Sequence, residues 1–148
     1  MPDGWNIETV LAASANIRSY DPSRADFKRI SLPGRPVVPT SELRIDVRYL
    51  VNNPRQTAKE AADEFANAPD PSRSELRPVC RRDDLTIAGQ PATLSVEETT
   101  NPSMPRQLVR VHFVVSPTRD RLFILFAWPS DTARSAELDR FLSTFAVQ

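Results

Sequence analysis

The residues best suited to nucleophilic or acid–base chemistry are a single histidine, His112, and a single cysteine, Cys80. A histidine base needs a nucleophile beside it and an acid that orients it, and no Gly-x-Ser-x-Gly or Cys–His pattern accompanies His112. Arg81 and Arg82 follow Cys80 and could lower the pKa of its thiol, but along a strand they point to alternate sides. The sequence favours a structural histidine and an incidental cysteine, with an enzyme that uses His112 or Cys80 as the alternative.

Metal and phosphate sites need residue spacings that this sequence does not contain. One histidine and one cysteine cannot complete four zinc ligands. The acidic pairs Asp83–Asp84 and Glu97–Glu98 do not have the alternate spacing of an EF-hand loop. With three glycines in the chain, neither the G-x-G-x-x-G loop nor the G-x-x-x-x-G-K loop is present. We therefore expect no metal and no cofactor.

Charge and length exclude further classes of protein. The 19 basic and 19 acidic residues cancel, so no net field attracts nucleic acid or an anionic membrane. No apolar run reaches the roughly 18 residues of a spanning helix, and we expect contact with a membrane to be peripheral at most. A chain of 148 residues corresponds to a single domain, residues 1–148. We expect this domain to be a monomer that does not bind nucleic acid.

The clearest strand runs from Glu42 to Leu50, where apolar and charged residues alternate. The segment Leu122 to Trp128 is apolar on both faces, so it belongs in the middle of a sheet covered on both sides. Further strands are expected in Thr9–Tyr20, Leu76–Arg82, Asp84–Ala88, Ala92–Glu98 and Gln107–Ser116.

Two helices are expected. Thr57 and Glu60 form a capping box at the start of a helix that ends near Asn67. The second helix, with Ser130 or Asp131 as its cap, is indicated by apolar residues at i, i+3, i+4 and i+7: Leu138, Phe141, Leu142 and Phe145. Hairpins combined with helices predict an α+β fold, in which a mostly antiparallel sheet is sandwiched between helices as α/β/α.

The pair Gly89–Gln90 predicts a hairpin with a two-residue loop. That loop would place Arg82 opposite Glu97 and Arg81 opposite Glu98, where opposite charges stabilise a strand pair. This pairing explains the acidic residues better than a calcium site does.

A long proline-rich loop is expected between Ser23 and Thr40, because proline restricts the backbone and removes a hydrogen-bond donor. A stiff loop loses little entropy on binding, and arginine is favoured at interfaces. The expected partner surface comprises Arg29, Pro33, Arg35, Pro36 and Pro39. The alternative is that this loop is a passive connection across the end of the sheet.

Three segments resemble the PsbP-like superfamily, which includes the PsbP, DcrB-type and LpqN-type proteins and the Mog protein. Pro2-Asp3-Gly4-Trp5 is similar to its "P-x-G-W" start, and Leu85 to Ala92 is similar to its "G-x-P-A" turn. The end of the chain, Phe141-Leu142-Ser143-Thr144-Phe145, resembles its closing helix. The resemblance covers nearly the whole chain.

The resemblance implies the same helix–sheet–helix sandwich and offers no catalytic residue. It implies a non-enzymatic accessory or protein-binding domain of an envelope or photosynthetic membrane complex, such as photosystem II, with an unidentified protein as partner. The abrupt start at Pro2 suggests that a leader or lipoprotein linker precedes the domain. We therefore expect it in the periplasm, in a lumen or on the cell surface, with the cytoplasm as the alternative.

A third possibility is a module that carries a ligand in an apolar pocket between sheet and helix. Leu43, Val47 and Phe65 would line such a pocket.

Overall fold

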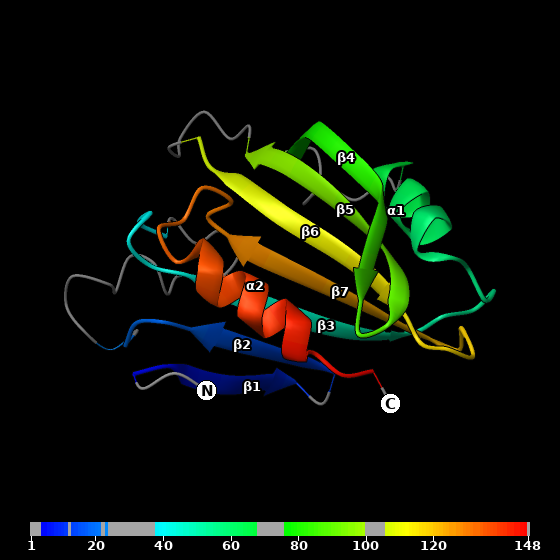
Figure 1. Cartoon of the computed structure of the whole chain (residues 1–148), viewed down its shortest axis with the longest axis horizontal. Coiled ribbons are helices and arrows are strands. Elements are labelled where there is room, and N and C mark those ends of the chain that lie inside the picture. The colour runs from blue at the N-terminus through cyan, green and yellow to red at the C-terminus, as the bar shows by residue number, and fades with distance from the viewer. Residues whose placement is uncertain are drawn as a thin grey trace.

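The computed structural model describes residues 4–11, 13–21, 23, 38–67, 76–99 and 106–147. Its centre is one seven-stranded sheet with the strand order β1-β2-β3-β7-β6-β5-β4, in which every neighbouring pair is antiparallel (Figure 1). The strands are β1 (Asn6–Leu11), β2 (Ser14–Arg18), β3 (Arg44–Val51), β4 (Leu76–Ile87), β5 (Gln90–Thr99), β6 (Leu108–Val115) and β7 (Arg121–Trp128). The helices are α1 (Ala58–Asn67) and α2 (Ser135–Thr144).

The expected sandwich of a sheet between helices is wrong. Strands make up 49% of the described residues and helices only 18%. Each helix has ten residues and is therefore about 15 Å long. Seven strands spaced about 4.8 Å apart form a sheet about 30 Å wide, which neither helix can cover. The fold is a broad antiparallel sheet that carries two short helices.

β7 lies in the middle of the sheet, between β3 and β6, as its apolar sequence predicted. Leu122, Ile124 and Phe126 belong to the core that includes α1, whereas Leu125 and Ala127 belong to the cores that include α2. The prediction that this strand is buried on both faces is confirmed.

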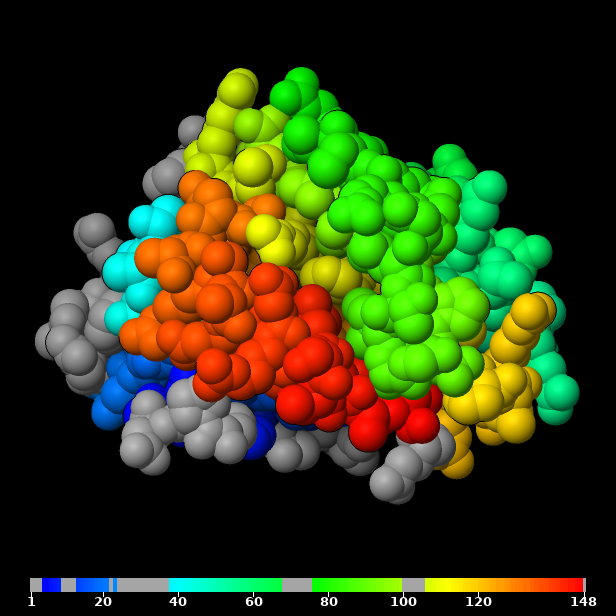
Figure 2. All heavy atoms as spheres, in the orientation of Figure 1, coloured from blue at the N-terminus to red at the C-terminus, as the bar shows by residue number. Residues whose placement is uncertain are grey.

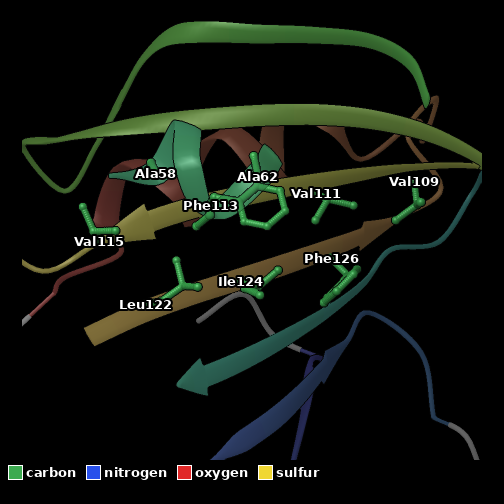
Figure 3. Packing of buried hydrophobic residues seen from close by; sticks show 10 residues of the cluster. Ala58, Ala62, Val109, Val111, Phe113, Val115, Leu122, Ile124 and Phe126 are labelled. Atoms are coloured by element: carbon green, nitrogen blue, oxygen red, sulfur yellow. The ribbon is translucent and has the colours of Figure 1, made fainter. Parts of the chain in front are cut away.

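The core beneath α1 combines small helix residues with large sheet residues (Figure 3). Ala58, Ala61 and Ala62 let the helix backbone approach the sheet, and the ring of Phe65 meets the edge of Phe113 at 5.2 Å between centroids. The predicted capping box is confirmed. The Thr57 backbone N–H donates to a Glu60 carboxylate oxygen at 2.7 Å, and the Glu60 N–H donates to the Thr57 hydroxyl at 3.1 Å.

α2 lies on the opposite face of the sheet, in front of β7 and β3 in Figure 1. Its one fully buried side chain is Leu138. Phe141 and Phe145 also pack on the sheet, and the centroid of the Phe145 ring lies 5.7 Å from that of Phe123.

α2 begins later than Ser130 or Asp131 predicted, because the preceding residues are bound elsewhere. Arg134 is its N-cap, and no side chain caps the helix. The Thr132 hydroxyl donates to the Glu42 carbonyl at 2.7 Å, and the Ala133 N–H donates to the Thr40 carbonyl at 2.7 Å. These bonds hold the segment before the helix against the chain that leads into β3.

The β4–β5 hairpin forms, but its predicted register is wrong. The turn residues are Ala88 and Gly89, both with positive φ, so the turn lies one residue earlier than expected. Register shifts between Pro78 and Cys80 and between Arg82 and Leu85 move the pairing further.

The charged pairs of that hairpin change with the register. Arg82 lies opposite Leu94 and Arg81 opposite Ser95. Glu98 instead faces Arg77, with 2.6 Å between a guanidinium nitrogen and a carboxylate oxygen.

Two other strand boundaries differ from expectation. The single strand expected in Thr9–Tyr20 is the hairpin of β1 and β2. The two segments expected around Asp83 form one continuous strand, β4.

Truncation of Leu138 should show that α2 is anchored mainly through this residue. We expect Leu138→Ala to lower the free energy of unfolding by about 2 to 5 kcal/mol, as for other fully buried leucines. The matched control is Leu50→Ala, because Leu50 is 45% exposed; it should cost less than about 1 kcal/mol. Urea denaturation measures both values, and equal losses would contradict this packing of α2.

Candidate functional site

His112 and Cys80 lie on the same face of the sheet, the face that carries α2. In the strand register, His112 on β6 lies beside Leu94 on β5. Val96 on β5 lies between Cys80 on β4 and Arg110 on β6. Paired residues of neighbouring strands share a face. β5 lies between the two candidate residues, so the histidine and the cysteine do not form a catalytic pair.

Six residues on this face form what we call the open sheet patch: Cys80, Arg82, Leu94, Val96, Arg110 and His112. The first turns of α2 pack on the other half of the sheet, against Ile17, Ile45 and Ala127. Near its end, Leu142 and Phe145 pack against the core that contains Ile87 of the hairpin. The patch lies beyond this contact.

The space-filling view shows the same arrangement as a hollow. In Figure 2, atoms of β6 (yellow) are visible at the centre of the view, at the bottom of the hollow between α2 (orange to red) and the β4–β5 hairpin (green). The hairpin and the end of α2 close the hollow at one end.

His112 lies deep in this patch. Its side chain is 3% exposed, and its Nδ1 atom has no hydrogen-bond partner in the described part of the chain. Burial, and then the positive charge of Arg110, lower the pKa of His112 to about 4. The imidazole is therefore neutral at physiological pH, and such a low pKa makes it a weak general base.

Arg110 is half-buried in the same patch. Its Nε donates a long hydrogen bond of 3.4 Å to the Ser130 hydroxyl, and it forms no ion pair with any described residue. Leu94 and Val96 on β5 are also half-buried. The patch thus presents apolar surface around one cation that has no carboxylate partner within the described ranges.

The thiol of Cys80 is exposed on β4. Arg81 points away from it, to the α1 face, where it pairs with Asp83 and with Asp63 of α1. Arg82 shares the face of Cys80 but pairs with Asp84, with 3.2 Å between Nε and Oδ1. Neighbouring carboxylates thus neutralise the positive charges of both arginines.

The acidic pairs are engaged in protein contacts. Asp83 accepts from Arg81 and Glu98 from Arg77, whereas Glu97 is buried and accepts from the Ser95 hydroxyl at 3.3 Å. Among residues that the structure describes, no group of three His, Cys, Asp or Glu side chains is placed to hold a metal ion.

A second polar cluster lies on the α1 face of β2 and β3. Arg44 donates to both carboxylate oxygens of Asp46, at 2.7 and 2.9 Å, and Arg18 pairs with Glu8 at 2.9 Å. Burial raises the pKa of Asp46, and Arg44 opposes that rise. The Arg44 guanidinium also lies 5.6 Å from the centre of the Trp128 ring. Because these charges pair with one another, the cluster is structural.

Most of the expected partner surface lies outside the described residues: Arg29, Pro33, Arg35 and Pro36. Pro39 is described and exposed, and its carbonyl accepts from the Glu42 N–H at 2.9 Å. The preceding residue, Val38, is buried against Tyr20 and Trp128.

The apolar pocket expected between sheet and helix does not form from the residues proposed for it. Leu43 and Val47 pack in the core with α2, and Phe65 packs in the core with α1. The sheet separates them, so the three side chains cannot line one cavity.

The sequence patterns did not predict the patch around Arg110 and His112. Leu94 and Val96 follow the strict alternation of a half-buried strand, and that pattern predicts core positions. No local signal reveals that α2 stops short of them.

No protein-family model matches the chain, and no curated protein matches its sequence. The resemblance to the PsbP-like superfamily therefore stays a prediction. No helix among the described residues is long and apolar enough to cross a membrane.

The buried histidine predicts a loss of stability in acid. Its pKa is about 4 in the folded protein and about 6.5 in the unfolded chain, so the unfolded state binds the proton more tightly. The contribution of His112 to the free energy of unfolding is fully present above the pKa that the histidine has in the unfolded chain. It falls by about 3 kcal/mol as the pH drops from about 7 to below 4.

The measurement is chemical denaturation of the wild type and of His112→Gln across this pH range. Carboxylates titrate in both proteins, so the difference between them isolates the histidine. If the two stabilities fall in parallel, His112 is not buried in its neutral form.

Proposed function

We propose that this domain is a non-enzymatic, extracytoplasmic binding protein that holds another protein through the open sheet patch. The observation that supports this is the combination of half-buried Leu94 and Val96 with Arg110, which no described carboxylate neutralises. Apolar residues with an arginine in a partly enclosed surface are typical of protein interfaces.

The positions of the two reactive residues favour binding over catalysis. His112 is buried and neutral, and Cys80 lies on the other side of β5. Neither residue has the nucleophile–base geometry that covalent catalysis needs.

The resemblance to PsbP-like proteins supports an accessory role in an envelope or photosynthetic membrane complex. Of the residues that carry it, Trp5 packs beside α2, and its indole N–H donates to Glu137 at 3.1 Å. Ala88 and Gly89 form the hairpin turn that closes the hollow at one end. The compartment and the kind of complex belong to this proposal.

Site-specific photocrosslinking tests the proposal. We expect a photoreactive phenylalanine at Val96 to form one discrete adduct in cells that make the protein, because a partner would cover this position. The matched control is Ile7 on β1, an apolar residue that is 56% exposed at the far edge of the sheet. Adduct mass is read by gel and mass spectrometry.

Two results would contradict the proposal. One is the absence of any adduct at Val96, and the other is an equal pattern of adducts from Val96 and Ile7. Each variant is first checked for cooperative unfolding, so that a failure to fold is not read as a failure to bind.

A further inference from the structure

We propose that the open sheet patch binds an extended, acidic segment of the partner protein, with the guanidinium of Arg110 as the contact for a carboxylate. This inference rests on the proposed function and names the chemistry of the partner.

The first argument is the unsatisfied donor capacity of Arg110. A guanidinium has five N–H donors in a planar fork that matches a carboxylate. In this structure the one described hydrogen bond of Arg110 is the 3.4 Å bond from Nε to Ser130. Its half-buried position reduces competition from water, so a charge-assisted bond there is stronger than at an exposed arginine.

The second argument comes from His112, two residues further along β6. His112 is 3% exposed, and its Nδ1 atom is buried, so a bound segment does not reach that atom. The buried imidazole is neutral at physiological pH and adds no charge to the patch. Arg110 is therefore the charged group beside Leu94 and Val96 that a carboxylate of the segment would meet.

The third argument is the shape and composition of the surroundings. Leu94 and Val96 are two residues apart on β5 and face the same way, beside His112 and Arg110 in register. An extended segment repeats its side chains every two residues and therefore fits this spacing. Apolar side chains of such a segment would cover the β5 residues while an acidic side chain meets Arg110.

The test uses the whole domain and a fluorescent eight-residue peptide with serine at the even positions and with valine and glutamate in turn at the odd positions, so that one face of the extended chain carries both side chains. A matched peptide carries glutamine in place of glutamate. Fluorescence anisotropy should show tighter binding of the glutamate peptide to the wild type. Arg110→Gln should weaken that binding at least about tenfold, as expected when a hydrogen bond between charged groups is lost. Arg110→Lys, which keeps the charge without the fork, should have an intermediate effect.

The matched control is Arg140→Gln, because Arg140 is exposed on α2 and outside the patch. It should leave the affinity unchanged, and the glutamine peptide should not distinguish Arg110→Gln from the wild type. Equal affinity of the wild type for both peptides, or equal losses in Arg110→Gln and Arg140→Gln, would overturn the carboxylate proposal. If crosslinking at Val96 persists in that case, the patch still binds a protein and only the acidic chemistry is wrong.

Discussion

β7 packs a different core on each of its faces, and the rest of the structure is arranged around that requirement. Phe126 meets the core of α1 on one side, while its neighbours Leu125 and Ala127 meet the cores of α2 on the other. A strand with two apolar faces cannot lie at an edge, so it is inserted between β3 and β6. The two helices must then lie on opposite faces, since each apolar face needs a cover.

This requirement also leaves surface uncovered. α2 has ten residues, and Leu138 anchors it over β7 and its neighbours on the β3 side. The end of α2 meets β4, β5 and β6 near the hairpin turn, at Ile87, Ala92 and Val114, and the three strands extend beyond this contact on that face. Leu94, Val96 and Arg110 therefore stay half-buried next to a helix that does not cross them. The proposed binding surface follows from the mismatch between a short helix and a wide sheet.

Local patterns predicted the elements well, and global geometry explains the failures. The alternation of β3, the Thr57 capping box and the two apolar faces of β7 depend on neighbouring residues, and the sequence indicates them directly. The sandwich depends on helix length against sheet width, and the hairpin register depends on irregular pairing around Val79 and Asp84. The patch depends on where α2 ends its contact with the sheet, which no single segment encodes.

The most direct measurement is a nuclear magnetic resonance map of the bound surface. It compares amide spectra of the isotope-labelled domain alone and with the partner recovered by crosslinking. The account predicts that the largest changes fall at Leu94, Val96 and Arg110, with the resonances of β1 and α1 unchanged. Changes concentrated on β1 or α1, with the patch unaffected, would contradict it.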